Sequence, residues 1–148
     1  MKITFLGTGT STGIPIIACD CRVCTSTDPR DKRRRASIHV EVGETHLVVD
    51  TPPDFRDQAL TFRIRRVDAV LITHSHADHI FGLDDIRRYN TIQKHAIPVY
   101  GSAGTLSDIH RIFDYVRRES PPDTYRPNIR LMEAAAPFAV GPATVVPV

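Results

Sequence analysis

The stretch that decides the fold of this chain is THSHADH, residues 73–79. It follows an apolar run, 67–73, which is typical of a buried strand. In an extended segment, side chains two residues apart lie on one face, so His74 and His76 are placed to bind one metal ion. Asp78 and His79 follow a turn later, within reach of a second ion. The sequence therefore predicts a metal centre at the C-terminal end of a strand, where α/β sheets tend to place their sites.

The donor types of this motif indicate the class of metal. Imidazole nitrogen suits Zn, Fe or Mn, and a carboxylate adds a harder donor. Two such ions about 3.5–4 Å apart can share a hydroxide and clamp an oxyanion. The alternative is a solvated polar loop with a chance excess of histidine, but four potential ligands within six residues argue against it. The remaining histidines stand alone, so we expect packing or surface roles for His39, His46, His95 and His110.

A second group of metal-ligating side chains lies near the N-terminus. Cys19, Cys21 and Cys24 place three thiols within six residues. Thiolates bind Zn at about 2.3 Å, and a tight loop can supply three ligands. A closed site needs a fourth ligand, which the local sequence does not offer. Three free thiols, or a redox pair at Cys21 and Cys24, are the alternatives to a structural zinc site.

Three weaker signals each leave two interpretations open. The glycine-rich stretch 7–13 is either a phosphate-cradling loop or a tight turn, and it lacks the Gly-Lys-Ser/Thr of a Walker A motif. Asp50 ends a predicted strand and either orients a metal-bound histidine or serves as a turn residue. The basic run 30–35 either contacts phosphates or is a solvated loop.

Composition limits the classes of protein that this chain can represent. Its 148 residues suit one domain, with an ordinary 41% of hydrophobic residues. The net charge of +2 is too small to argue for a nucleic acid or a membrane surface as partner. An odd, crowded set of cysteines favours a reducing compartment, and no signal segment or membrane span is visible. We therefore expect a cytoplasmic location.

Periodicity predicts a mixture of strands and helices. Alternating apolar residues predict strands, and 3.6-residue spacing predicts helices, one of them with Thr105 and Asp108 as a capping pair. The mixed order suits an α/β sandwich. The expected strands are 2–6, 37–42, 45–50, 67–73 and 98–101, with short ones between 129 and 148; the expected helices are 55–65, a segment through Leu83, Ile86 and Tyr89, and 105–116.

Together these motifs resemble the metallo-β-lactamase superfamily. The glycine-rich loop, the Cys-Asp-Cys-x-x-Cys motif and Asp28-Pro29-Arg30-Asp31 are similar to the PhnP-like branch, whose members open phosphoribosyl 1,2-cyclic phosphate. The resemblance implies an αββα sandwich, of which residues 1–148 would form one partial domain: the first half plus connecting elements, without the C-terminal half. It also implies that His74 and His76 bind the first catalytic metal and that Asp78 and His79 bind the second.

The same resemblance implies a structural zinc on the three cysteines, completed in the family by a histidine near the C-terminus. Only His95 and His110 follow His79, so we expect the other catalytic ligands in the second half of the family fold. An isolated first half would expose an apolar sheet face, and we expect it to self-associate and to catalyse poorly.

The function that these expectations imply is hydrolysis of a small cyclic phosphodiester by a hydroxide activated between two Zn or Mn ions. Asp78 and His79 would then take part in catalysis as well as in metal binding. Two alternatives remain: an RNA-processing nuclease of the tRNA 3′-end type, and an inactive zinc-binding fragment of such a hydrolase. The expected partner is a small phosphodiester, with no membrane, nucleic acid only for the nuclease alternative, and a homodimer as an open possibility.

Overall fold

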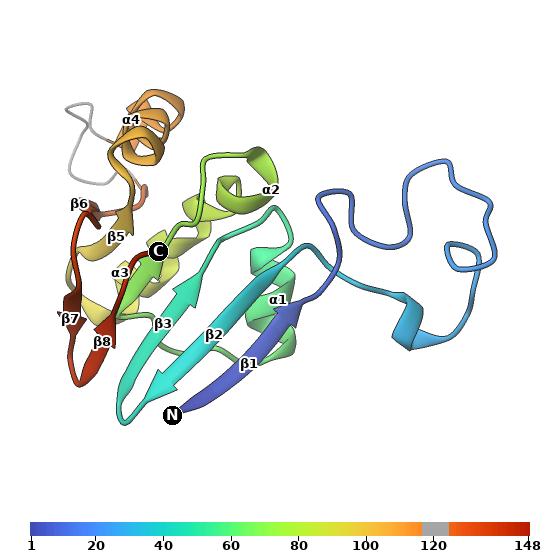
Figure 1. Cartoon of the computed structure of the whole chain (residues 1–148), viewed down its shortest axis with the longest axis horizontal. Helices are drawn as coiled ribbons and strands as arrows, with labels where there is room; N and C mark the ends of the chain where they lie inside the picture. The colour runs from blue at the N-terminus through green and yellow to red at the C-terminus, as the bar shows by residue number, and fades with distance from the viewer. Residues whose placement is uncertain (117–124) are drawn as a thin grey trace.

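The computed structural model describes residues 1–116 and 125–148. Its centre is a six-stranded sheet with the strands in sequence order, antiparallel from β1 to β3 and parallel from β3 to β6 (Figure 1). Gly43 adopts a φ of 59° in the tight turn between β2 and β3. The strands are β1 (Lys2–Gly7), β2 (Ser37–Val42), β3 (Thr45–Val49), β4 (Ala69–Leu71), β5 (Ile97–Gly101) and β6 (Ile129–Glu133).

Helices cover one face of this sheet, and a two-stranded hairpin packs on part of the other. Successive strand residues point to opposite faces, so Val48 lies in the core with the helices while Leu47 packs under the hairpin. The stacked rings of Tyr100 and Phe138, with centroids 4.1 Å apart, join the hairpin to β5. The helices are α1 (Phe55–Thr61), α2 (Ala77–Ile80), α3 (Arg87–Gln93) and α4 (Ala103–Ile112), with 3-10 turns η1 (Pro29–Asp31), η2 (Leu83–Ile86) and η3 (Asp114–Val116); the hairpin is β7 (Phe138–Val140) and β8 (Ala143–Val145).

The hairpin leaves the β1 end of its face uncovered. Ile3 is 48% exposed and Phe5 is 65% exposed. A shallow groove of about 360 Å³ is lined by Phe5, Ile38, Val49 and Asp50 among others. An exposed apolar face of this kind favours association, so self-association remains a prediction for this chain.

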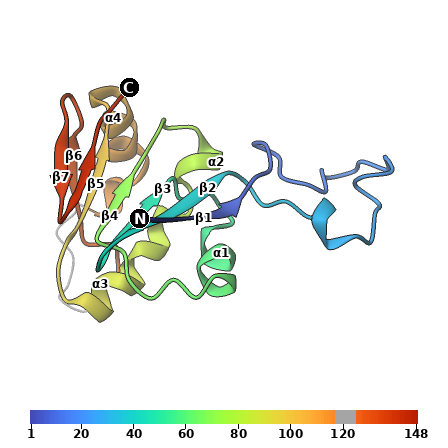
Figure 2. The ribbon, with the colours of Figure 1, turned by 60° about the horizontal axis from the view of Figure 1, so that its bottom comes forward.

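Between β1 and β2 the chain makes a long excursion away from the sheet, drawn at the right of Figures 1 and 2. Two isolated β-bridges, Gly9 with Arg35 and Ile14 with Arg33, join the outgoing and returning segments of this excursion. Gly7 and Gly9 permit this approach, because a Cβ at Gly7 would lie 2.0 Å from the Arg35 carbonyl oxygen. The cysteine motif lies at the outer part of this excursion.

Several local predictions need correction. The helix predicted for residues 55–65 ends at Thr61, because Arg63 turns the chain with a φ of 54°. The predicted capping pair of Thr105 and Asp108 is wrong: Ser102 caps α4, and its hydroxyl accepts the Thr105 N–H at 3.2 Å. The predicted segment through Leu83 and Tyr89 divides into η2 and α3. Among the described residues, no helix has the length and apolar composition needed to cross a bilayer.

Candidate metal centre

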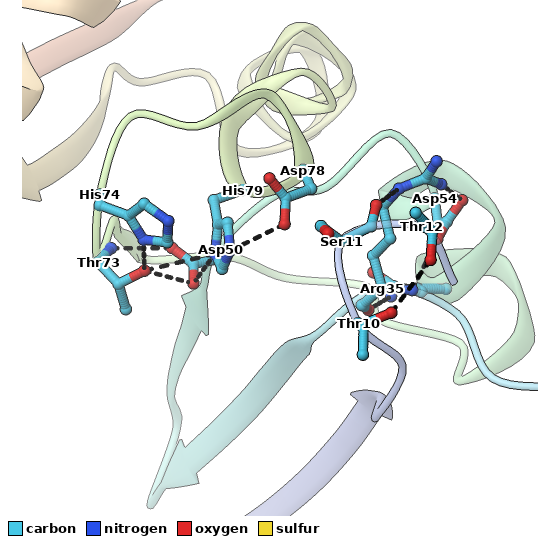
Figure 3. Close-up of polar contacts among 11 residues, drawn as sticks. Thr10, Ser11, Thr12, Arg35, Asp50, Asp54, Thr73, His74, Asp78 and His79 are labelled. Carbon is cyan, nitrogen blue, oxygen red and sulfur yellow. Dashed lines mark hydrogen bonds and ion pairs between the residues drawn. The ribbon is translucent and has the colours of Figure 1, made fainter. Parts of the chain in front are cut away.

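The histidine motif lies where β4 ends and α2 begins. His76 is extended, with φ −64° and ψ 150°, and immediately precedes the helix. The ring centroids of His74 and His76 are 4.6 Å apart, and those of His74 and His79 are 4.0 Å apart. The three imidazole rings thus lie near one another (Figure 3 shows His74 and His79), and their role as metal ligands remains a prediction.

Asp50, which directly follows the neighbouring strand β3, fixes this cluster. Its side chain is buried, and one carboxylate oxygen accepts the Thr73 N–H at 2.8 Å. The other accepts the Thr73 hydroxyl at 2.8 Å and lies 2.7 Å from His79 Nδ1 (Figure 3). A carboxylate on one ring nitrogen orients a metal-binding histidine and leaves the other nitrogen for the ion. The geometry therefore favours the orienting role for Asp50 over that of a turn residue.

The backbone conformation of Asp50 is itself unusual. Its φ of 60° lies in the left-handed region, which aspartate visits more readily than most residues. Such conformations persist where surrounding contacts fix them, and they cluster at functional sites. Here the Asp50 N–H donates to the Leu71 carbonyl at 2.9 Å, and its own carbonyl accepts the Ser37 hydroxyl at 2.9 Å. These bonds hold the carboxylate at the edge of the sheet.

Helix α2 is attached directly to the segment that follows Asp50. The Thr51 N–H donates to the His79 carbonyl at 2.7 Å, and the Gly82 N–H donates to the Thr51 carbonyl at 2.8 Å. Any side chain at Gly82 would collide with this segment, because its Cβ would lie 2.1 Å from the Pro52 carbonyl oxygen. The preceding Ile80 is fully buried in the core. The core thus determines where His79 lies.

A second contact fixes the loop that carries the first two histidines. The Ser75 hydroxyl donates to Asp108 of α4 at 2.6 Å. Asp108 also pairs with Arg111 at 3.2 Å, and the Ser75 bond followed by the Arg111 contact lowers the pKa of the Asp108 carboxyl. The histidine loop is therefore held by β3 on one side and by α4 on the other.

The donor set suits a divalent transition metal. His79 Nε2 lies 3.2 Å from Asp78 Oδ2, so a ring nitrogen and a carboxylate oxygen face one another. The other ring nitrogen of His79, Nδ1, already contacts Asp50. Imidazole with carboxylate is a combination that binds Zn or Mn. His95 instead contacts its neighbours Gln93 and Ala96, at 3.3 Å and 3.0 Å.

The three cysteines form a more compact cluster than the histidines. Their sulfur atoms all lie within 4.8 Å of one another, and within residues 1–116 and 125–148 no other trio of such ligands is so close. The Cys24 backbone N–H, then the Cys19 and Cys24 thiols, lower the pKa of Cys21 to about 7. A thiol that ionises near neutral pH is suited to metal binding, because the thiolate is the ligand. This geometry supports a metal site more than three independent thiols.

Sequence reasoning missed the residues that anchor the excursion next to the histidine motif. Arg35 pairs with Asp54 at 2.9 Å, and its Nε donates to the Ser11 carbonyl at 2.8 Å (Figure 3). Arg34 pairs with Asp57. Both arginines of the basic run therefore form ion pairs with residues of the segment 54–57. Contacts between side chains 19 and 23 residues apart leave no local signal in one sequence.

Comparisons with known proteins agree with this architecture. A model described as a β-lactamase superfamily domain matches residues 45–148. A solved diphosphatase of the PhnP family is 37% identical, with a TM-score of 0.88 over 99% of this chain and 55% of that one. Zn²⁺-bound PqqB from Methylobacterium extorquens, at 23% identity and a TM-score of 0.72, shows the fold alone.

Among curated proteins, the chain is 44% identical to an octanoyltransferase of Porphyromonas gingivalis, over 99% of this chain but 30% of that protein. It is 32% identical to coenzyme PQQ synthesis protein B of Methylorubrum populi, over 77% of this chain and 42% of that protein. The chain thus spans less than half the length of these curated relatives. The superfamily match covers most of the chain, and the six-stranded sheet with its strand-end histidine motif agrees with it, so the chain belongs to the metallo-β-lactamase superfamily.

Proposed function

We propose that this protein hydrolyses phosphodiesters, with a small cyclic phosphodiester as its substrate class. The observation that carries the proposal is the Asp50–His79 contact at 2.7 Å, which prepares one ring nitrogen beside Asp78 for a metal ion. His74 and His76 would hold one divalent ion, and Asp78 and His79 the other. Bound ions would lower the pKa of water and stabilise the negative charge that develops on phosphoryl oxygens.

The residues of the chain supply orientation. Asp50 accepts the Nδ1 proton of His79, which fixes the tautomer and leaves the Nε2 lone pair for the ion. Thr73 donates its N–H and its hydroxyl to the same carboxylate, so Asp50 cannot rotate away without breaking three contacts. Preorganised polar groups of this kind contribute to catalysis because they need no rearrangement during the reaction.

Two features support phosphodiester chemistry over other reactions of the superfamily. The glycine-rich loop and the Cys-Asp-Cys-x-x-Cys motif resemble the PhnP-like branch, and a solved diphosphatase of that family is 37% identical. That diphosphatase also makes hydrolysis of a diphosphate linkage the second candidate. Human tRNase Z, short form, at 23% identity, shares the fold and gives no support to the nuclease alternative.

The test is hydrolysis of bis(p-nitrophenyl) phosphate by protein expressed from the complete reading frame, with Mn²⁺ or Zn²⁺ supplied. We expect turnover that falls at least about 100-fold in His76→Ala and Asp78→Asn, because each removes a metal ligand. His95→Ala is the matched control, since among the described residues its ring bonds only to Gln93 and Ala96, and it should keep wild-type turnover.

Parallel assays separate the candidate substrates. A five-membered cyclic phosphodiester, a dinucleoside diphosphate and a precursor tRNA are compared by kcat/KM. Preference for the cyclic ester supports the proposal, and preference for the diphosphate or the tRNA overturns its substrate class. Absence of turnover with all of them, from metal-loaded protein, would overturn the phosphodiesterase proposal itself.

A further inference from the structure

The glycine-rich loop between β1 and the excursion lies beside the metal centre. Figures 1 and 2 both show it next to α2, and Figure 3 shows the Ser11 hydroxyl on the side of the loop that faces Asp78. Thr10, Ser11 and Thr12 are all exposed. The loop therefore presents the Ser11 hydroxyl toward the space in front of the predicted metal ligands.

Backbone contacts hold this loop in one position. The Gly9 N–H donates to the Arg34 carbonyl at 2.7 Å, and the Gly13 N–H donates to the Thr10 carbonyl at 2.9 Å. A Cβ at Gly9 would lie 2.6 Å from the Arg33 carbonyl oxygen, so the returning strand of the excursion packs directly on the loop. A loop held at both glycines can place its hydroxyls without an ordering cost when a ligand arrives.

Arg35 joins the loop to the segment that orients His79. Its Nε donates to the Ser11 carbonyl at 2.8 Å, and its Nη1 pairs with Asp54 at 2.9 Å. Asp54 also accepts the Arg35 backbone N–H at 2.8 Å, and it lies four residues after Asp50. The planar guanidinium, with donors in a fixed fork, reaches both partners at once. One framework thus sets the position of the hydroxyl loop relative to the metal ligands.

The three hydroxyl groups of the loop differ in their hydrogen bonding. Thr10 and Thr12 bond to one another at 3.1 Å. The Ser11 hydroxyl has no hydrogen-bond partner among the residues that the structure describes. Asp54 neutralises the charge of Arg35, so the loop 7–13 offers hydrogen-bond donors without a net positive charge. Such a surface suits a phosphodiester, whose non-bridging oxygens share one negative charge. A monoester carries two negative charges and is better bound by Arg or Lys.

We propose that the loop 7–13, positioned by Arg35, forms the side of the site that selects the substrate, called the specificity wall below. The Ser11 hydroxyl donates to a non-bridging oxygen of a phosphodiester monoanion. Arg35 is a positioning residue in this arrangement, because it acts through the loop and keeps its own contacts to Asp54 and Ser11. The inference rests on the proposed function and adds the substrate's charge state to it.

The test measures binding separately from turnover. Dimethyl phosphate, a monoanionic diester that resists hydrolysis, is titrated calorimetrically into metal-loaded protein from the complete reading frame. Ser11→Ala should weaken its affinity about tenfold, as for one lost hydrogen bond to a charged group, with metal content unchanged. Phenyl phosphate, a dianionic monoester, should bind the wild type more weakly than dimethyl phosphate does.

Two further variants address Arg35. Arg35→Met should weaken dimethyl phosphate binding more than Ser11→Ala does and should raise KM for bis(p-nitrophenyl) phosphate more than it lowers kcat, with partial rescue in Arg35→Lys. Arg30→Met is the matched control, because Arg30 is exposed and pairs only with Asp28 among the described residues. If Arg35→Met fails to fold, Ser11→Ala decides, since its exposed side chain is removed without disturbing the core.

The outcomes separate this inference from the proposed function. Unchanged dimethyl phosphate affinity in Ser11→Ala, or tighter binding of the monoester by the wild type, overturns the inference even when the protein hydrolyses diesters. Loss of binding in Ser11→Ala without any turnover by the wild type supports the loop as the specificity wall and overturns the phosphodiesterase proposal.

Discussion

The two predicted metal sites of this chain are held in opposite ways. The histidine motif is attached to the body of the fold: Asp50 contacts it from β3, Asp108 contacts it from α4, and Ile80 is buried beneath it. The cysteine cluster lies in the outer part of the excursion, where local contacts hold it, such as the Ile16 N–H on Cys24 Sγ at 3.4 Å. Yet the cysteine sulfurs are the more tightly grouped set.

The difference indicates, for each site, whether the protein positions the metal ion or the metal ion orders the protein. At the histidine motif the core fixes the ligands, so a bound ion adds chemistry to a position that exists already. In the cysteine loop little apolar burial opposes the conformational entropy of an ordered chain, and an ion would supply the folding free energy, as in small metal-stabilised domains. The predictions below test this contrast, from the largest expected effect to the smallest.

Gly82→Ala should give the largest effect, because it pushes α2 away from the core. The new Cβ would lie 2.1 Å from the Pro52 carbonyl oxygen and 2.8 Å from Phe55 Cβ, and backbone on one side leaves no room for adjustment. We expect a loss of about 3 kcal/mol in the free energy of unfolding, measured by urea denaturation. Gly104→Ala is the matched control: nothing lies within 4 Å of its Cβ in helix α4, so it should be neutral or stabilising by about 1 kcal/mol. Equal effects of the two would mean that the core does not fix α2.

Asp50→Asn tests the carboxylate that orients His79. The amide keeps one acceptor oxygen for Thr73, but it loses the charge that favours a proton on His79 Nδ1. We expect metal affinity at the histidine motif to fall about 10- to 100-fold, measured by competition with a chromophoric chelator, while zinc on the cysteines is retained. Asp57→Asn removes a carboxylate that is 64% exposed and should leave metal affinity unchanged. A wild-type affinity in Asp50→Asn would show that the ligands do not depend on β3.

Cys21→Ser tests the opposite arrangement in the loop. It removes the exposed member of the thiol cluster, so we expect the loss of one bound zinc per chain and faster amide exchange across residues 16–28. The exchange of Val48 and Val70, both fully buried in the sheet, should be unchanged. Unchanged zinc content would refute the cysteine assignment, and faster exchange in the sheet would show that the loop supports the core.

How far the sequence predicted this molecule depends on the range of the interaction. Strand positions followed from alternation, which is local: Ile38, Val40 and Val42 were expected on one face of a strand and lie in β2. The histidine motif was equally local, since its ligands lie within six residues. By contrast, the Arg35–Asp54 pair joins the segment before β2 to the segment before α1 across 19 residues, and no local periodicity in the sequence indicates it.

Helix ends show the same limit on a smaller scale. Thr105 and Asp108 have the spacing of a capping pair, but Ser102 stands at the true start of α4. Ser102 was not distinguished because Ser, Thr and Asp are all good caps, and only the end of β5 at Gly101 decides among them. Asp108 is instead engaged by Ser75, a contact that depends on how α4 packs against β5 and β6.

That contact supplies the smallest predicted effect. Ser75→Ala removes the hydroxyl that donates to Asp108 at 2.6 Å and leaves all four predicted metal ligands in place. The Ser75 bond is the main cause of the lowered pKa of Asp108, with Arg111 second, so the variant should raise that pKa toward the ordinary aspartate value. A depressed carboxyl pKa stabilises the fold above the pKa of the unfolded chain, and this contribution disappears as pH falls through the folded value. The stability difference between wild type and variant should therefore be present at neutral pH and vanish in acid. Carboxyl-detected NMR titration gives the pKa, and Arg111→Met, which removes the second cause but keeps the Ser75 bond, should shift it less. If Ser75→Ala leaves the Asp108 pKa unchanged, α4 does not hold the histidine loop, and Asp50 alone accounts for its order.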